Sequence, residues 1–437
     1  MKEQIQIGLL ANHLRKNGVF DINIISETIH KRKEKDVSDK RFVYDRYAEY
    51  GSSSNVMLSD LNGNSKQCIL WTVNHYLGLN RHPDVIRSAA EALHLYGSGC
   101  GTSAMSVGFN GLHIRLKEKL EKIYTGKSVL LFPTGYTANS GSLSTLANSG
   151  DLVLFDREAH ASILEGVKNS GAKYLPFKHN DLVDLEKKLA KYSDVFQNVF
   201  VVVESAYSMS GDFSPLAELS LLKERYKFLL YLDEAHTFGI YGEKGAGLAH
   251  ALGIQSEVEF LVATLSKSAG SKGGIMVADQ KYCTYLQCNS STYIFQACLS
   301  PADTAAALKA IELFSDNDTF SKELHEKNQY FRKSLISSGF YLGESLSPIV
   351  PVFIPDLQVL YAVSENLYQL GVYTTPVAYP VVGAKEGRLR FIVNTTHSTE
   401  EIDYTVNALV QSFKVAGVNN IDSYFNNFRN LKKGLVC

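Results

Sequence analysis

Short apolar runs alternate with longer amphipathic stretches along most of the chain. The apolar runs are predicted to be buried strands, and they cover residues 128–132, 152–155, 198–203, 228–232, 260–263 and 275–278. Between several of them, apolar residues recur at helical spacing, as they do over residues 112–123. Alternating strands and helices predict an α/β fold, in which helices cover both faces of a mostly parallel central sheet to give three layers.

The pattern changes beyond a long helix that begins near Pro301. The elements that follow predict a smaller α+β domain, and they are a helix over residues 320–338, strands over 349–354 and 389–393, and a last helix over 400–413. We therefore expect the large domain to span residues 66–305 and the small C-terminal domain to span residues 306–437.

The first 65 residues are more polar and carry no strand-like run. Regular structure is expected to begin near Cys68, so residues 1–65 are predicted to form an irregular N-terminal arm. The apolar residues that share one face of a short helix in this arm are Ile5, Leu9, Leu10 and Leu14. Such a helix would dock on a partner subunit or touch a membrane surface, and we favour the docking arm.

Composition and charge exclude several classes of protein. The 437 residues are 45% apolar and carry a net charge of −1, which gives no electrostatic reason to expect a nucleic acid or an acidic membrane as partner. The longest apolar stretches are shorter than a membrane span, and the N-terminus lacks the apolar core of a signal peptide. No two of the six cysteines have CxxC spacing, so we expect reduced thiols, no metal site and a cytoplasmic protein with at most peripheral membrane contact.

The stretch from Leu261 to Gly274 is the first candidate for chemistry. An apolar strand ends there in hydroxyl groups, several glycines and one lysine, Lys267. A lysine held at a strand end can lose its proton through desolvation and attack a carbonyl group, as in Schiff-base chemistry. Thr264 and the glycine-rich turn could bind a phosphate, although the spacing of a nucleoside-triphosphate loop is missing. Taken alone, the stretch is explained more simply by a solvated lysine in a Gly/Ser loop.

Polar side chains also follow the other predicted strands. They belong to His160, Ser208, Asp233 and His236, and a strand-to-helix turn at Gly135 and Tyr136 adds backbone N–H groups. Each has an ordinary structural explanation by itself, since Asp233 could cap a helix, His160 could be a buried histidine and Ser208 a turn residue. However, the carboxyl ends of parallel strands meet at one edge of a sheet, where ligands bind. Together with Lys267, these residues predict one site with an anion-binding turn, an acid, two imidazoles, a hydroxyl and an amine.

Arg390 lies among apolar neighbours in the predicted strand 389–393. An arginine in such a strand either binds a carboxylate through two parallel hydrogen bonds or makes a structural ion pair. The residues around Arg390 leave both interpretations open.

The order and spacing of these motifs resemble those of the α-oxoamine synthases, which are pyridoxal-phosphate enzymes of the aspartate-aminotransferase fold (fold type I). The resemblance covers about residues 65–415 and rests on Asn74–Leu79, Tyr96–Cys100, Thr134–Asn139, His160–Ser162, Ser208–Asp212, Asp233–His236, Thr264–Gly274 and Leu389–Phe391. Less discriminating stretches, such as Lys178–Asp181 and Ser347–Pro351, are most similar to the bacterial serine palmitoyltransferase branch of this family.

The resemblance implies a role for each site residue toward pyridoxal 5'-phosphate. Lys267 would hold the cofactor as an imine and move the substrate's Cα proton, while Asp233 would face the pyridine nitrogen. His160 would stack on the ring and contact the substrate. The remaining implied contacts are those of His236 and Ser208 with the phenolic oxygen, of the Gly135 and Tyr136 backbone and the Thr264 hydroxyl with the phosphate, and of Arg390 and Asn74 with the substrate.

The implied reaction is a decarboxylative Claisen condensation of a small amino acid with an acyl thioester, catalysed by a homodimeric acyltransferase. Serine and a long-chain thioester of coenzyme A or acyl carrier protein are the favoured substrates, and the product would be a 3-ketosphinganine-like α-amino ketone. Cysteate, glycine or alanine is the alternative amino acid. A fold-related aminotransferase or aldolase, and a cofactor-binding protein without catalysis, are the other classes considered.

Two residues depart from the pattern of the family. Gln296 stands where a serine or threonine usually reaches the phosphate of the neighbouring subunit's site, and Ala104 stands where an arginine is common. Both are expected to line or approach the active-site cleft, so both bear on subunit contact and on the choice of substrate.

Overall fold

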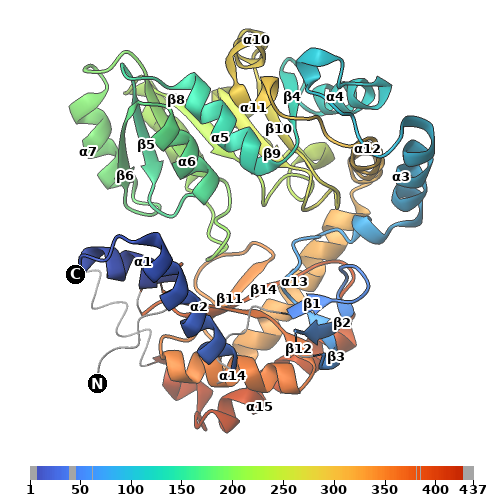
Figure 1. The fold of residues 1–437 in the computed structure, drawn as a ribbon, viewed down its shortest axis with the longest axis vertical. Helices are drawn as coiled ribbons and strands as arrows, with labels where there is room; N and C mark the ends of the chain where they lie inside the picture. Colours follow the sequence, from blue (N-terminus) through green and yellow to red (C-terminus); the bar gives the residue numbers. More distant parts are fainter. Residues whose placement is uncertain (1–6, 39–45, 62, 380, 384, 427–437) are drawn as a thin grey trace.

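The computed structural model describes residues 7–38, 46–61, 63–379, 381–383 and 385–426. The chain forms two lobes, one built around a seven-stranded sheet and the other around two smaller sheets (Figure 1). No helix in these ranges combines the length and the apolar character needed to cross a bilayer. The five cysteines in these ranges are free thiols, and Cys437 lies outside them.

The seven-stranded sheet has the order β4-β10-β9-β8-β7-β5-β6. Its strands are β4 (Ser128–Phe132), β5 (Leu152–Asp156), β6 (Lys173–Phe177), β7 (Val199–Glu204), β8 (Leu229–Asp233), β9 (Phe260–Thr264) and β10 (Gly274–Ala278). Neighbouring strands from β9 to β6 are parallel, whereas β10 is antiparallel to both of its neighbours. The sheet is therefore mostly parallel, and the predicted α/β fold class is confirmed.

Helices cover both faces of this sheet, because its strands present apolar side chains to both sides. On one face, strand residues such as Leu130 pack with α5 (Gly135–Leu146) and α6 (Ala161–Asn169). On the other face, residues such as Val129 pack with the helices α4 (Gly111–Ile123), α7 (Leu182–Tyr192) and α12 (Pro301–Asp316). Burial of both faces explains why these strands form continuous apolar runs in the sequence.

Strand β6 was not predicted, and its place at the edge of the sheet explains why. Lys173 and Tyr174 are exposed there, and the strand contains Pro176, so it carries no apolar run. Proline and charged residues are typical of edge strands, where one side of the backbone needs no partner. Its existence depends on pairing with β5 rather than on its own residues.

The second lobe contains the C-terminal elements. Its antiparallel sheet has the order β11-β14-β13, formed by β11 (Ile349–Phe353), β14 (Arg388–Ile392) and β13 (Thr375–Val377). The helices around it are α13 (Thr319–Ser337), α14 (Leu357–Gln369) and α15 (Thr399–Val415). The predicted strands near 349–354 and 389–393 and the predicted helices near 320–338 and 400–413 are confirmed, whereas α14 and β13 were not predicted.

The residues expected to form an irregular arm contain regular structure. They form two helices, α1 (Ile7–Lys16) and α2 (Ile22–Ser38), and the strands β1 (Arg46–Ala48) and β2 (Asn55–Asp60). β2 pairs with β3 (Ser65–Leu70), which in turn pairs with β12 (Val372–Tyr373) from the far end of the chain. The expectation of irregular structure up to residue 65 was wrong, because β1 and β2 each pair with the next strand along the chain although neither contains a long apolar run.

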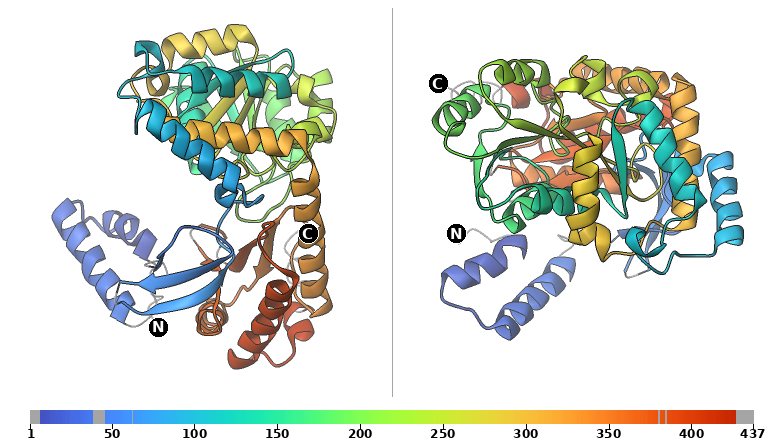
Figure 2. Two further views of the ribbon diagram at one scale, coloured as in Figure 1. Left: turned by 90° about the vertical axis from the view of Figure 1, so that its right-hand side faces the viewer. Right: turned by 90° about the horizontal axis from the view of Figure 1, so that it is seen from above.

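The amphipathic helix expected around Leu9 and Leu14 exists as α1, while Ile5 lies outside the described residues. None of its side chains is buried in this chain. Helices α1 and α2 pack on each other and stand away from the two lobes (Figure 2).

The helix in which the domain boundary was placed, α12, packs against α4 and against α3 (Pro83–Tyr96) of the large sheet's lobe. Helix α13 then leads into the other lobe and packs on α15 (Figure 1). These contacts favour a change of domain between α12 and α13 rather than at residue 305. Strand pairing groups β2 and β3 with β12 of the C-terminal part. The predicted division at residue 65 separates β2 from its partner β3 and stays a prediction.

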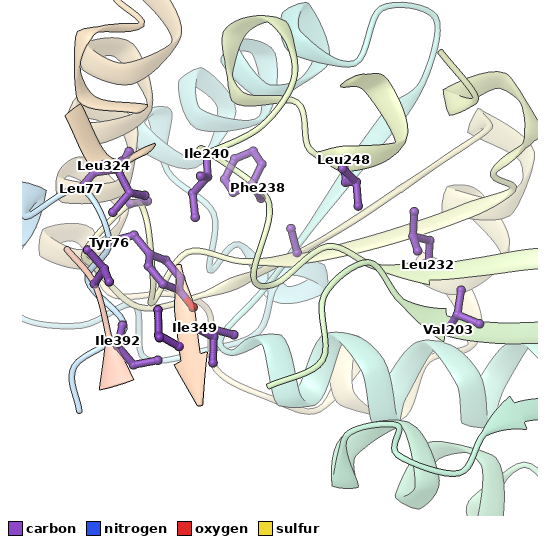
Figure 3. Close-up of a cluster of buried hydrophobic side chains, with 14 of the residues drawn as sticks. Tyr76, Leu77, Val203, Leu232, Phe238, Ile240, Leu248, Leu324, Ile349 and Ile392 are labelled. Carbon is purple, nitrogen blue, oxygen red and sulfur yellow. The ribbon is translucent and has the colours of Figure 1, made fainter. Parts of the chain in front are cut away.

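One apolar cluster continues from the large sheet into the second lobe. Figure 3 shows Val203 and Leu232 of the large sheet at one end, and Ile349 and Ile392 of the smaller sheet beside Tyr76 at the other. Because burial of this apolar surface stabilises the contact between lobes, it holds them in a defined relation.

Candidate active site

The carboxyl ends of the central strands open into a pocket of about 250 Å³. The predicted site residues that line it are Gly135, Tyr136, His160, Asp233, His236, Thr264 and Lys267. They come from the ends of β4, β5, β8 and β9, so the expectation that the strand ends meet at one site is met by the geometry. Asn74, Ser208 and Arg390 do not line this pocket and form a group beside it.

Lys267 lies three residues beyond the end of β9 and is partly buried. Desolvation lowers the pKa of its amine to about 8, even though the nearby carboxylates of Asp233 and Glu204 oppose this shift. Arg390 adds to the lowering through charge repulsion. The amine is thus far easier to deprotonate than an ordinary lysine, which is what a nucleophilic or proton-transferring lysine needs.

Asp233 is buried at the end of β8, and both of its carboxylate oxygens accept hydrogen bonds. The backbone N–H of Ala235 donates to Oδ1 at 2.8 Å, and the side-chain amide of Asn139 donates to Oδ2 at 2.6 Å. The carboxylate is therefore held in one orientation at the pocket wall.

The two histidines are fixed by different partners. The backbone N–H of His160 donates to Glu204 at 2.5 Å, and its ring Nδ1 lies 2.7 Å from the Ser162 hydroxyl. Nδ1 of His236 lies 2.6 Å from the hydroxyl of Tyr76, which is fully buried. Desolvation lowers the pKa of both imidazoles, that of His236 strongly, so both are neutral at physiological pH.

The turn between β4 and α5 has the features of a phosphate site. Thr134 caps α5, and the first backbone N–H groups of the helix face the pocket region around Gly135. A Cβ atom at Gly135 would lie 2.9 Å from Cβ of Thr264, so only glycine permits this close approach. The Tyr136 side chain instead donates outward to Glu165, so only its backbone is available to an anion.

Arg390 reaches from β14 to the large sheet's lobe. Its Nε donates to the carbonyl oxygen of Ser208, and its Nη2 donates to Oδ1 of Asn74 at 3.1 Å. No acidic residue in the described part of the chain forms an ion pair with it. A largely buried guanidinium without a carboxylate partner is suited to an anionic ligand, because a buried charge is costly unless it is paired.

Several residues at the site had no predicted role. Glu204, Asn139 and Ser162 line the pocket, and Tyr76 holds His236. Glu204 is the first polar residue after an apolar strand, so the same strand-end argument could have found it. Asn139 and Tyr76 lie inside a helix and an apolar stretch, and only the three-dimensional contacts indicate their importance.

The two departures from the family pattern lie away from this pocket. Neither Ala104 nor Gln296 is among the described residues that line it. Ala104 packs against the apolar cluster of the large sheet, while Oε1 of Gln296 is buried without a hydrogen-bond partner among the described residues. The expectation that both line or approach the active-site cleft stays a prediction, because Gln296 is expected to reach the site of a neighbouring subunit.

Comparisons with known proteins agree with the fold. The family described as aminotransferase class I and II matches residues 66–409. A serine palmitoyltransferase of Sphingobacterium spiritivorum is 34% identical over 82% of this chain and 89% of its own length, and an 8-amino-7-oxononanoate synthase of Thermoanaerobacter pseudethanolicus is 31% identical over 90% and 97%. The solved structure of a serine palmitoyltransferase from S. paucimobilis with bound PLP (pyridoxal 5'-phosphate) has a TM-score of 0.85 at 28% identity and covers 91% of this chain and 100% of that one.

The fold and the site define a PLP-dependent enzyme of fold type I. The chain belongs to the class I and II aminotransferases and, within them, to the α-oxoamine synthases, which are acyltransferases. Its residues fit the cofactor, because the pocket combines a glycine turn at a helix N-terminus, a buried carboxylate and a lysine with a lowered pKa.

The lowered pKa of Lys267 predicts how cofactor-free protein takes up PLP. The uptake rate should rise with pH between about pH 6 and pH 9 with a midpoint near 8, because only the neutral amine attacks a carbonyl. Visible absorption after mixing measures the rate. The exposed Lys272 provides a matched control, since Lys272→Ala should keep the profile while Lys267→Ala abolishes covalent uptake. A midpoint near the ordinary lysine pKa would contradict the prediction.

Proposed function

We propose that this enzyme condenses serine with a long-chain acyl thioester. The amino acid loses carbon dioxide, its Cα bonds to the acyl carbon, and the thiol leaves, which gives a 3-ketosphinganine-like α-amino ketone. The observation that carries this proposal is the partly buried guanidinium of Arg390, which lies beside the pocket of Lys267 and Asp233 and has no acidic partner among the described residues. It supplies an amino-acid carboxylate site next to the groups that would hold PLP.

When bound, PLP would supply an electron-withdrawing ring that stabilises negative charge at the substrate's Cα. The N-terminus of α5 at Gly135 and Tyr136, together with Thr264, would hold its phosphate. Asp233 would bind the pyridine N–H, and His160 would lie against the ring face. His236 would donate to the phenolic oxygen, and the Ser208 hydroxyl would contact the same oxygen while its backbone carbonyl accepts from Arg390.

Lys267 would remove and return the proton at Cα. Its amine has a pKa of about 8, so it is present in both protonation states near neutral pH. The neutral His160 would be available to donate a hydrogen bond to substrate. Asn74 would orient Arg390 through the hydrogen bond to Nη2, and so would act on the carboxylate indirectly.

Serine is favoured over other amino acids by the similarity to serine palmitoyltransferases. The second candidate follows from the relatives named 8-amino-7-oxononanoate synthase. In that product the amino group is on C8 and C9 is a methyl group, so the amino acid that supplies them is alanine and the acyl chain carries the terminal carboxylate. Cysteate and glycine remain alternatives with the same chemistry.

Product analysis tests the reaction. The protein loaded with PLP is incubated with serine, alanine, glycine or cysteate and a long-chain acyl thioester of coenzyme A or acyl carrier protein. Carbon dioxide, free thiol and an α-amino ketone are expected with serine, and the mass identifies the ketone. Lys267→Ala should form no product, while Lys272→Ala should match the wild type. A keto acid without carbon dioxide or thiol would instead indicate an aminotransferase, and product with alanine alone would transfer the assignment to the second candidate.

Arg390→Lys tests the carboxylate site. A lysine can neither keep both existing hydrogen bonds nor match a carboxylate with a planar fork, so serine binding should weaken by about 1.5–3 kcal/mol. Titration of the visible spectrum with serine measures this. The control is Arg388→Lys on the same strand, because Arg388 already pairs with Glu386 and should not affect serine. Unchanged serine affinity in Arg390→Lys would remove Arg390 from the substrate site.

We also infer that the enzyme acts as a homodimer in which the segment around Phe295 meets a second copy. Phe295 is 84% exposed, and the neighbouring Gln296 carries a buried amide oxygen without a partner in the described ranges. Solvent exposure of so large an apolar side chain is relieved by burial against another subunit. Phe295→Asp should therefore shift the protein toward monomer in sedimentation, whereas Val183→Asp, which changes a residue 64% exposed on α7, should not. A fully active wild-type monomer would refute the inference.

A further inference from the structure

A chain of hydrogen bonds in the wall of the pocket joins Asp233 to His160. The side-chain Nδ2 of Asn139 donates to Oδ2 of Asp233 at 2.6 Å and also to the hydroxyl of Ser162 at 3.0 Å. The Ser162 hydroxyl lies 2.7 Å from Nδ1 of His160. On its other side, Asn139 accepts from the hydroxyl of Tyr231 at 3.0 Å. Asn139, Ser162 and Tyr231 are all buried.

The direction of each bond follows from the groups themselves. A carboxylate can only accept, so the amide nitrogen of Asn139 must face Asp233, and the amide oxygen is left for Tyr231. The Ser162 hydroxyl receives the second amide hydrogen, and Nδ1 of His160 is the one acceptor that the described residues offer for its own hydrogen.

The backbone leads to the same result at the histidine. The N–H of Ser162 points at Nδ1 of His160 at 3.2 Å, where the imidazole caps the start of α6. A backbone N–H can only donate, so Nδ1 accepts and carries no hydrogen when the ring is neutral. The hydrogen of neutral His160 is then on Nε2, the ring nitrogen for which the described residues supply no partner, on a side chain that lines the pocket.

We propose that Asn139 and Ser162 are positioning residues, which together orient the carboxylate of Asp233 and keep the hydrogen of His160 on Nε2, available to substrate. The amide of Asn139 thus bonds directly to Asp233, which would bind the pyridine nitrogen, and through Ser162 to His160, which would contact the substrate. This inference rests on the roles proposed above for Asp233 and His160. Its first test needs neither cofactor nor substrate.

The first test is nitrogen NMR of cofactor-free protein with ¹⁵N-labelled histidine rings, in which His160→Gln identifies the His160 signals. The wild type should show N–H on Nε2 and an unprotonated Nδ1 at neutral pH. Ser162→Ala removes the hydroxyl donor that disfavours protonation of Nδ1, so the pKa of His160 should rise. Ser144→Ala is the control, because the Ser144 hydroxyl bonds only to its own helix at Gly141.

The second test addresses Asp233. Asn139→Asp keeps the shape and the acceptor for Tyr231 but places an acceptor against the carboxylate, so PLP should bind about tenfold or more weakly and its absorption should shift. The Ser162→Ala protein should bind PLP within about twofold of the wild type, because the bond from Asn139 to Asp233 remains.

The outcomes separate this proposal from the proposed reaction. A hydrogen on Nδ1 of wild-type His160, or a His160 titration that Ser162→Ala leaves unchanged, would overturn the proposal whatever reaction is catalysed. Unchanged PLP affinity in Asn139→Asp would overturn the part that concerns Asp233. If Asn139→Asp does not fold, the NMR measurements on the wild type and Ser162→Ala still decide the part that concerns His160. A different product in the substrate assay would change the reaction and leave these results intact.

Discussion

The burial of charge at the end of the central strands is the constraint on which this site depends. Asp233 is 4% exposed, and a carboxylate in such a place must have hydrogen bonds or a nearby cation. The N–H of Ala235, the amide of Asn139 and the amine of Lys267 provide these. Because the three groups come from the β8 turn, from α5 and from the loop after β9, one carboxylate ties together the elements that form the pocket.

The same desolvation also sets the chemistry of the basic groups. It lowers the pKa of Lys267 to about 8 and keeps His160 and His236 neutral at physiological pH. Neutral nitrogen atoms can accept and transfer protons, which charged ones cannot do as readily. In a solvent-filled cleft the pKa of this lysine would stay near its ordinary value of 10.5 and the neutral amine would be far rarer, so the packing of the strand ends raises the share of neutral amine at Lys267.

The two lobes divide the work at the site. The large sheet supplies the groups that fit a phosphate and a pyridine ring, while β14 of the second lobe supplies Arg390. Arg390 bonds to Ser208 and Asn74, and the apolar cluster around Tyr76 spans both lobes. These contacts hold the two lobes in a fixed position relative to each other.

Sequence alone determined the α/β class, most central strands and the main reactive groups, because strands buried on both faces form clear apolar runs and their polar ends must converge at one edge of a sheet. It did not determine β6 and β12, which lie at sheet edges and depend on pairing with β5 and β3. It also did not determine β1 and β2, because these short strands contain no long apolar run although each pairs with the next strand along the chain. It also did not distinguish the two interpretations of Arg390, for which the structure shows no acidic partner among the described residues. The roles of Asn139, Ser162 and Tyr76 needed the tertiary structure, since hydrogen-bond direction depends on which donor faces which acceptor and no spacing in the sequence encodes that.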